Sequence, residues 1–570
     1  MIHDLVIRAG TVIDGTGGPA RTCDVAVDGD RVTAVGRAGR ARREVDAAGA
    51  LVTPGFVDIH THYDGQATWD DRLQPSSGQG VTTVVMGNCG VGFAPVRPGD
   101  QDQLIELMEG VEDLPGTVLH EGLPWSWEGI GGFLDALDGR PRDIDCAAQV
   151  CHGPLRLYVM GRRGADREPA SPDEIAEMGR LAAEGIRAGA LGFTTSRTLN
   201  HRTSRGEPTP TLTAARDELV GIASAIGDTG TGVLQVISDF PDFDDEGETL
   251  LEMVRRSGRP LSISLAQSGP GDGYRRHLEL LERANREGLT MRAQVAARAI
   301  GALIGLEGSV NPLQHSGTYA GLAGLPPAER AARLAGPAVK RQVLAELADR
   351  PGGTRLRLER VFELGDPPDY EPAPEASVAA RAARDGRAPE DLLYDLLLGA
   401  GGTALLYMPV LNYFDGNLDV AGELLAHPCT VPGLGDGGAH VGTICDASFP
   451  TTLLAYWGRD RDRGRRFELP WIVEQQCRAT ARTVGLRDRG VLAPGYRADI
   501  NVIDFDNLAL HPPRIVRDLP AGGKRLMQEA DGYLHTFVAG VEVYAGGRPT
   551  GALPGRLVRG ARPAPAGVAG

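Results

Sequence analysis

The sequence predicts an α/β protein in which a central set of parallel strands and helices is joined to a small β unit built from both chain ends. Through the middle of the chain, short apolar runs typical of buried strands alternate with helical patterns. At the two ends, short β-type runs are separated by glycine-rich turns instead. This order favours either a (β/α)8 TIM barrel or an open parallel sheet for the centre, because both repeat a strand–helix unit.

Eight candidate strands occupy the central part of the chain, which is the number that a closed barrel needs. They cover residues 55–60, 81–86, 145–151, 190–194, 232–237, 261–265, 290–295 and 431–435. One intervening helix is well marked, because Ser171 and Glu174 have the spacing of a capping box and Pro172 stands in the first turn. Gly189 supplies its stop.

The β-type runs at the two ends predict one shared sheet. They cover residues 4–9, 23–28, 31–35, 498–504, 533–538 and 541–544. We therefore expect a β-sandwich domain made of residues 1–53 and 491–556, attached to a barrel of residues 54–490. The stretch at about 309–402 exceeds a normal barrel connection, so we expect an insertion there that covers the site. Residues 557–570, rich in Ala, Pro and Gly, are expected to form a flexible tail.

The composition argues against several classes of function. A chain of 570 residues with 42% hydrophobic and 24% charged residues can bury one large core with a small companion domain. The formal net charge of −16 disfavours a nucleic-acid partner, because phosphate backbones attract clusters of Lys and Arg. Seven cysteines without a CxxC pair indicate no disulfide framework. No apolar run approaches the roughly 20 residues that span a bilayer and the start has no secretory pattern, so we expect a cytoplasmic protein without membrane contact.

The apolar strand at 55–60 leads into two histidines separated by one residue, His60 and His62. Alternate residues of a strand point to the same side, so both imidazoles can converge on one ion near the carboxyl end of the strand. Barrel enzymes place their sites at that end. Two unrelated surface histidines are the alternative, and the buried strand before them favours a metal site.

A carboxylate and a thiol follow two other candidate strands. Asp436 comes directly after the last strand, where it could bind the metal and exchange protons with a water molecule and a leaving nitrogen. An Asp beside Gly is also a common turn. Cys89 follows the strand at 81–86, and a thiolate is a good zinc ligand. A lone cysteine is more often a small buried residue, which is the alternative for Cys89.

Other polar residues near strand ends are candidates for binding a substrate. Arg197 and His201 follow the strand at 190–194 and could hold a carboxylate, although a solvated loop would have the same composition. Arg298 offers the same chemistry beyond the strand at 290–295. The full set of substrate-binding candidates is Arg298, Arg197, His201, Tyr63, His152 and His440.

Five segments together resemble the amidohydrolase superfamily, and within it the N-acyl-D-amino-acid deacylase branch. They are residues 54–62, 80–90, 435–437, 488–499 and 550–556. The resemblance spans nearly the whole chain, and its motifs are more specific for the superfamily than for a substrate. It implies a (β/α)8 barrel, a β-sandwich from both chain ends, and zinc as the usual metal.

The sequence departs from that branch on the fifth and sixth strands, which normally each supply a histidine. Residues 233–239 and 261–267 contain none. Gln235 and Gln267 are poor substitutes for imidazole on zinc, so we do not expect them to be ligands. The remaining set of His60, His62 and Asp436, with Cys89, predicts a site for one Zn²⁺ or another divalent metal.

We therefore expect a metal-dependent hydrolase that cleaves a non-peptide amide bond, with Asp436 as the catalytic acid and base. The expected substrate is a small, carboxylate-bearing N-acyl amino acid, and the resemblance suggests the D form. Opening of a cyclic amide or imide, or a non-hydrolytic reaction on the same barrel, is a second hypothesis. A catalytically inactive, metal-free binding protein is a third. The oligomeric state is left open, and a homo-oligomer is compatible with the sequence.

Overall fold

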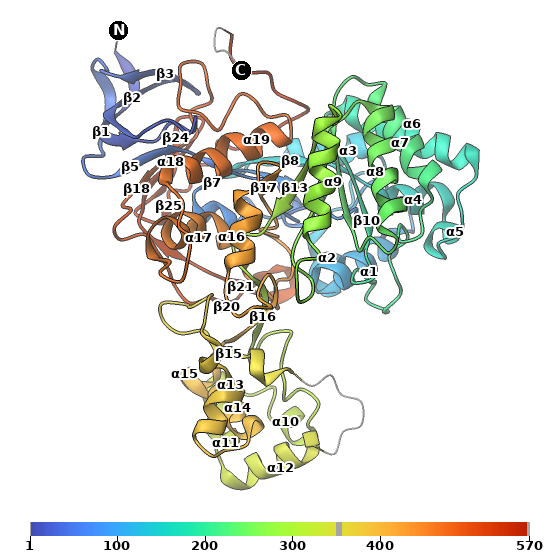
Figure 1. Cartoon of the computed structure of the whole chain (residues 1–570), viewed down its shortest axis with the longest axis vertical. Helices are drawn as coiled ribbons and strands as arrows, with labels where there is room; N and C mark the ends of the chain where they lie inside the picture. Colours follow the sequence, from blue (N-terminus) through green and yellow to red (C-terminus); the bar gives the residue numbers. More distant parts are fainter. Residues whose placement is uncertain (1, 349–355, 567–570) are drawn as a thin grey trace.

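The computed structural model describes residues 2–348 and 356–566. Residues 349–355 of the expected insertion and 567–570 of the expected tail lie outside this description. Parallel strands surrounded by helices form the centre of the molecule (Figure 1). They are β6 (Phe56–Asp58), β7 (Val81–Met86), β8 (Asp145–Ala148), β9 (Val150–Cys151), β10 (Gly192–Arg197), β11 (Val233–Ser238), β12 (Leu261–Ser264), β13 (Met291–Val295) and β17 (Thr430–Pro432). Since β8 and β9 are one strand interrupted at Gln149, all eight predicted strands are present.

Hydrogen bonds join these strands into a barrel. One group runs β6-β7-β8 and the other runs β9-β10-β11-β12-β13-β17, with every pair parallel. At the first junction between the two groups, where β8 leads into β9, the backbone N–H of Gln149 donates to the carbonyl of Met86 at 3.1 Å. At the second junction, β17 and β6 are joined by the segments that follow them. The backbone N–H of Asp436 donates to the carbonyl of His60 at 3.0 Å, and the backbone N–H of His62 donates to the carbonyl of Gly437 at 2.8 Å. The fold is therefore the predicted (β/α)8 type, and the second junction lies at the candidate site.

Amphipathic helices pack around the barrel. They are α1 (Gln101–Glu112), α2 (Gly116–Gly122), α3 (Ile130–Asp138), α4 (His152–Met160), α5 (Arg162–Ala165), α6 (Pro172–Ala188), α7 (Arg216–Gly227), α8 (Phe243–Ser257), α9 (Arg275–Arg286) and α16 (Asp419–Ala426). The predicted capping box begins α6, since Ser171 and Glu174 each accept a hydrogen bond from the other's backbone N–H. Gly189 ends the helix with φ +116°, a conformation that glycine adopts without strain.

The two chain ends share one nine-stranded sheet, as predicted. Its strands are β1 (His3–Val12), β2 (Arg21–Asp28), β3 (Arg31–Gly36), β4 (Ala41–Asp46), β5 (Leu51–Pro54), β18 (Ile500–Ile503), β23 (Tyr533–Val538), β24 (Val541–Ala545) and β25 (Arg548–Pro549). The antiparallel pair β5 and β18 joins the two halves. Val52, Ile500 and Phe537 lie fully buried in a hydrophobic core that belongs to this sheet.

Residues 300–348 and 356–411, which include most of the insertion expected at about 309–402, form a lobe that extends away from the barrel (Figure 1). It is built on the antiparallel strands β14 (Ile300–Ile304), β15 (Phe362–Glu363) and β16 (Leu406–Leu411). Its helices are α10 (Gly317–Ala320), α11 (Pro327–Leu334), α12 (Pro337–Ala348), α13 (Val378–Arg384), α14 (Pro389–Leu397) and α15 (Gly399–Gly402). The lobe has its own hydrophobic core, in which Leu334, Val343 and Leu397 are buried.

The last part of the chain returns to the barrel. After β17 come α17 (Phe449–Thr452), the π-helical η6 (Leu453–Asp460), α18 (Leu469–Val473), the π-helical η7 (Glu474–Ala479) and α19 (Thr480–Thr483), and later the hairpin of β20 (Arg514–Leu519) and β21 (Gly523–Met527). Leu557 and Val558 are buried, and Val558 donates to the carbonyl of Cys146 at 2.7 Å. This contact differs from the flexible tail expected from residue 557, because two apolar side chains at its start pack against the barrel.

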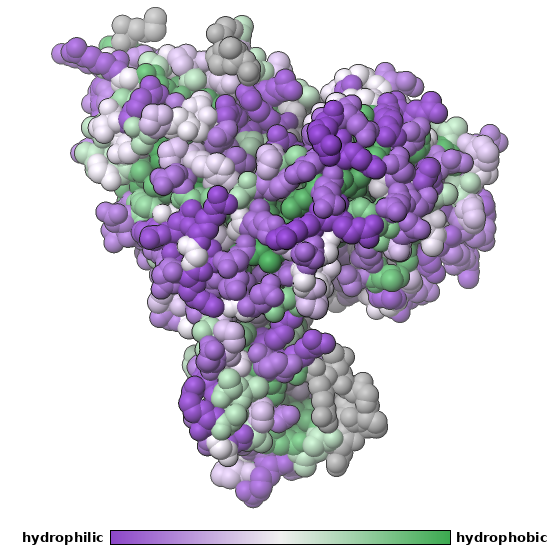
Figure 2. All heavy atoms as spheres, viewed as in Figure 1, coloured by the Kyte–Doolittle hydropathy of each residue, from purple (hydrophilic) through white to green (hydrophobic). Residues whose placement is uncertain are grey.

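Polar side chains cover most of the visible surface, and apolar residues occur there in small groups (Figure 2). Among the helices of the described residues, none is both long enough and apolar enough to cross a bilayer.

Candidate active site

His60 and His62 follow β6, and both are 1% exposed. Their Nε2 atoms lie 3.4 Å and 3.5 Å from Oδ1 of Asp436, which follows β17. The two segments are neighbours because the barrel closes between them, so residues from opposite ends of the barrel sequence meet. The structure thus brings together the three side chains that the sequence pattern singled out.

Cys89 completes this cluster. Its Sγ lies 3.4 Å from Nε2 of His60, and the potential ligand atoms of Cys89, His60 and His62 all lie within 4.8 Å of one another. Cys89 and Asp436 have φ values of +55° and +47°, which residues other than glycine rarely adopt. Such conformations concentrate at functional sites, because the surrounding structure must hold them in place.

A buried carboxylate lies behind His62. Glu112, the last residue of α1, places Oε1 3.2 Å from Nδ1 of His62 and Oε2 3.5 Å from Nε2 of His440. Its carbonyl also accepts the backbone N–H of His440. Burial raises the pKa of Glu112 well above its usual range, and the negative charges of Asp436 and Asp64 raise it further. Glu112 was not among the residues predicted from the sequence, because one more acid in a helix with several acidic residues resembles a solvated face.

Gln294 of β13 orients the other imidazole. Its Oε1 lies 2.7 Å from Nδ1 of His60, and its Nε2 donates to Ser262 at 2.9 Å. Since an amide oxygen only accepts hydrogen bonds, Nδ1 of His60 carries the proton. The Nε2 lone pair of His60 therefore faces Cys89 and Asp436. The sequence carries no signal for this role of Gln294.

These residues fit a divalent cation. Nε2 of His62 is buried and makes no hydrogen bond with any residue that the structure describes. Burial lowers the pKa of His62 to about 4, so at neutral pH the ring is uncharged, which is the form that binds metals. Two imidazole nitrogens, a sulfur and a carboxylate oxygen are the donor types that zinc accepts.

Gln235 on β11, the fifth strand of the barrel, and Gln267, just after the sixth strand β12, supply amides in this region. Oε1 of Gln235 accepts the backbone N–H of Cys89 at 3.2 Å, and its Nε2 donates to Ser264 at 3.1 Å. Nε2 of Gln267 donates to the carbonyl of Gly271 at 3.0 Å. The amide of Gln235 therefore holds the backbone of Cys89.

Two predicted substrate-binding histidines border the cluster. His440 contacts Glu112 and is partly exposed. Nδ1 of His201 lies 2.9 Å from Oγ of Ser196. Burial lowers the pKa of His201 to about 3, and the nearby His440 and His62 add to the effect. Both rings are thus placed at the edge of the candidate active site.

The two predicted arginines are engaged by partners inside the protein. Arg197 pairs with Glu246 through two hydrogen bonds, at 2.7 Å and 3.0 Å. Arg298 is 1% exposed, pairs with Asp446 at 3.1 Å and lies 3.5 Å over the ring of Tyr370. A substrate carboxylate would have to compete with these contacts, and the sequence could not reveal them because the partners lie far along the chain.

His152 and Tyr63 are also fully buried and bonded. The two ring nitrogens of His152 lie 2.8 Å from the Thr195 hydroxyl and 2.9 Å from Glu218. The hydroxyl of Tyr63 donates to Ser76 at 2.8 Å. These contacts account for both side chains structurally, and their role in binding a substrate stays a prediction.

Comparisons with known proteins agree with this architecture. Residues 43–544 match the model of the amidohydrolase family. N-acyl-D-glutamate deacylase of Alcaligenes xylosoxydans xylosoxydans is 28% identical over 568 residues, which is 98% of this chain and 96% of that protein. D-aminoacylase of the same organism is 33% identical over 271 residues, but the match covers only 46% of this chain and 50% of that protein. A solved D-aminoacylase structure aligns with a TM-score of 0.65 at 25% identity, covering 98% of this chain and 100% of that one.

The fold and the site define a class: a (β/α)8 barrel enzyme with histidine, cysteine and aspartate side chains gathered at the carboxyl ends of its strands. The chain belongs to the amidohydrolase family, since the family model matches most of its length. It is a hydrolase of carbon–nitrogen bonds other than peptide bonds.

Proposed function

We propose that the protein is a metal-dependent deacylase that hydrolyses the amide bond of an N-acyl amino acid, with the D form preferred. The observation that carries this proposal is the buried cluster of His60, His62 and Cys89 facing Asp436. The names of the relatives, N-acyl-D-glutamate deacylase and D-aminoacylase, support the substrate class.

One zinc ion or another divalent cation would be held by His60, His62, Cys89 and Asp436. When bound, such a cation polarises the amide carbonyl and lowers the pKa of water. A single ion is favoured over two, because β11 and β12 contribute glutamine amides where the related branch has imidazoles. The D-aminoacylase of the structural comparison is described as activated by one metal and attenuated by a second.

Asp436 is the group that moves protons in this proposal. Burial opposes its ionisation, but the close imidazoles of His62, His60 and His440 outweigh burial and hold its pKa below the usual range. An ionised Asp436 accepts the proton of the attacking water as the oxygen bonds to the amide carbon. It then passes that proton to the nitrogen as the carbon–nitrogen bond breaks, which releases a carboxylic acid and an amine.

Substrate contacts are proposed at the edge of the cluster, where His201 and His440 lie. Arg298, Arg197, Tyr63 and His152 are further candidates, provided that a bound substrate exchanges with their present partners. We also propose that residues 54–490 carry the activity and that the β-sandwich of residues 1–53 and 491–556 supports the barrel.

The test is a panel of N-acetyl-D-amino acids, their L forms and a cyclic imide, assayed for release of free amine and acid. We expect turnover of an N-acyl amino acid and about a 100- to 10,000-fold lower rate in Asp436→Asn. Asp385→Asn, an exposed position in the lobe, is the matched control and retains the wild-type rate. Turnover of the cyclic imide alone would favour ring opening instead, and an active Asp436→Asn would remove Asp436 from the mechanism.

A further inference from the structure

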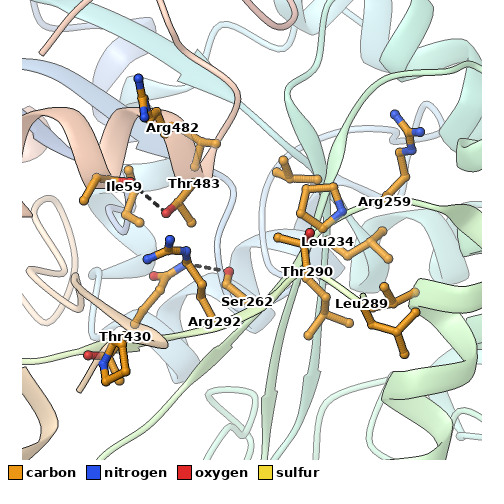
Figure 3. Close-up of a pocket in the computed structure, with 18 of the residues that line it drawn as sticks. Ile59, Leu234, Arg259, Ser262, Leu289, Thr290, Arg292, Thr430, Arg482 and Thr483 are labelled. Carbon is orange, nitrogen blue, oxygen red and sulfur yellow. Dashed lines mark hydrogen bonds between the residues drawn. The ribbon is translucent and has the colours of Figure 1, made fainter. Parts of the chain in front are cut away.

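A cavity of about 650 Å³ lies at the opposite end of the barrel from the candidate active site. Its lining includes the residues where central strands begin, such as Val233, Leu261 and Thr430, whereas His60 and Asp436 follow strand ends. Figure 3 shows this cavity between the barrel strands and the helical segment that carries Arg482. Such a volume is typical of small-molecule sites, which range over about 300–1,000 Å³.

The lining carries a surplus of positive charge. Six arginines and one carboxylate contribute to it: Arg255, Arg259, Arg292, Arg478, Arg482, Arg487 and Glu474. Glu474 pairs with Arg478, and Arg255 pairs with glutamates of its own surroundings. Within residues 2–348 and 356–566, the other four arginines make no ion pair with a carboxylate. This concentration is unexpected in a chain of net charge −16, where acids outnumber bases.

Arg292 is the most informative of the four. It lies on β13 two residues before Gln294, so both side chains lie on the same face of the strand, toward the barrel interior. Its register neighbour on β12 is Ser262, which also lines the cavity. A half-buried guanidinium without a carboxylate loses hydration and gains no ion pair in return, so an anion that enters the cavity would be stabilised there.

Apolar residues also line the cavity, beside polar ones such as Gln149, Thr290 and Thr483. Val233, Leu234, Leu261, Leu289 and Trp471 contribute side chains next to the arginines. A ligand with a negative charge and an apolar part would therefore complement both the arginines and the apolar residues of the lining. Guanidinium groups bind phosphate and carboxylate through paired hydrogen bonds, which favours those two groups as the charged part.

We propose that this cavity binds a small organic dianion, a phosphate or a dicarboxylate with an apolar part, at a site separate from the catalytic one. The layer formed by Gln294 and Ser262 separates the two, since Gln294 lines the cavity and also contacts His60. Nothing in the proposed deacylation uses the four unpaired arginines.

The test is calorimetric titration of the metal-loaded, full-length protein with phenyl phosphate and with phthalate, at constant ionic strength set by NaCl. Both probes carry two negative charges and one benzene ring, so their relative affinity identifies the preferred charged group. Benzoate, with one charge, is the control for binding of the ring. We expect saturable binding of one dianion per chain, with benzoate about tenfold weaker or more, because it loses charge-assisted hydrogen bonds.

Two variants place the binding in the cavity. Arg292→Gln and Arg482→Gln should each weaken the dianion about tenfold. Arg256→Gln is the control, since Arg256 is exposed on α8, pairs with Glu252 and does not line the cavity. Arg482 is exposed and tolerates replacement even if Arg292→Gln fails to fold. The proposal is overturned if neither dianion binds saturably, or if binding is equal in the wild type and in Arg482→Gln.

Discussion

Oε1 of Glu112 lies 3.2 Å from Nδ1 of His62, so a buried carboxylate stands behind a proposed metal ligand. A carboxylate that accepts a hydrogen bond from this nitrogen of a metal-bound histidine fixes the ring and makes its other nitrogen more basic. We predict that Glu112→Gln weakens metal binding by about 10- to 100-fold while the fold persists. Competition with a chromophoric chelator measures the affinity. Asp102→Asn on the same helix is the exposed control, and an unchanged affinity in Glu112→Gln would show that Glu112 does not position His62.

Cys89 gives a spectroscopic prediction. Cobalt bound to a thiolate has a charge-transfer absorption that a hydroxyl ligand does not produce, so Cys89→Ser should lose this band in the cobalt-loaded protein. Cys151→Ser is a matched control, because Cys151 is a buried neighbour on β9 outside the ligand cluster. The same band in Cys89→Ser and in the wild type would remove Cys89 from the metal site.

Gly110 of α1 provides a test of how the helix positions Glu112. A methyl group at Gly110 would clash with the backbone of residues 202–204, next to His201. Gly110→Ala should therefore cost about 1–3 kcal/mol of unfolding free energy and lower activity, because helix and loop must move apart. Gly247→Ala on α8 is the control, since its methyl would meet only Leu280 atoms at 3.5 Å and alanine favours helices. Denaturant unfolding and kcat/KM are the measurements, and equal effects in both variants would contradict the close packing.

Local patterns predicted most of the fold. The apolar runs located all eight barrel strands, because a strand buried on both faces is apolar along its length. The hydrogen bond from Gln149 to β7 could not be predicted, since it joins segments that are far apart in the sequence. The start of the tail was misjudged for a similar reason, as Leu557 and Val558 find their apolar partners on a distant part of the chain.

The same distinction applies to the site. His60, His62 and Asp436 stand out because their positions relative to strand ends are visible in the sequence. Glu112 and Gln294 do not, since their roles come from the packing of α1 and β13 against the histidines. Its place after a strand made Arg298 a candidate for holding a substrate carboxylate, but its contact with Asp446 arises only from the tertiary fold.

Glu346 predicts a pH effect in the lobe. Its carboxylate accepts hydrogen bonds from the Ser316 hydroxyl and from the hydroxyl and N–H of Thr318, which lower its pKa to about 2 from 4.5. Because the folded pKa is the lower one, this interaction stabilises the lobe above pH 4.5 and is lost as the pH falls towards 2. Hydrogen exchange of α10 and α12 should show reduced protection in Glu346→Gln at pH 7. Between pH 4.5 and 2, protection in this variant should depend less on pH than it does in the wild type. The exposed Glu359→Gln is the control, and wild-type protection in Glu346→Gln at pH 7 would contradict the assignment.

Reconstitution with metal shows whether His60, His62, Cys89 and Asp436 hold a catalytic ion. The protein is stripped with a chelator, titrated with zinc, and followed by elemental analysis and deacylation together. We predict that activity rises in proportion to bound zinc up to one ion per chain, and that the double variant His60→Ala/His62→Ala neither binds the ion nor turns over substrate. Full activity in the metal-free protein, or unchanged zinc binding in that double variant, would contradict this prediction.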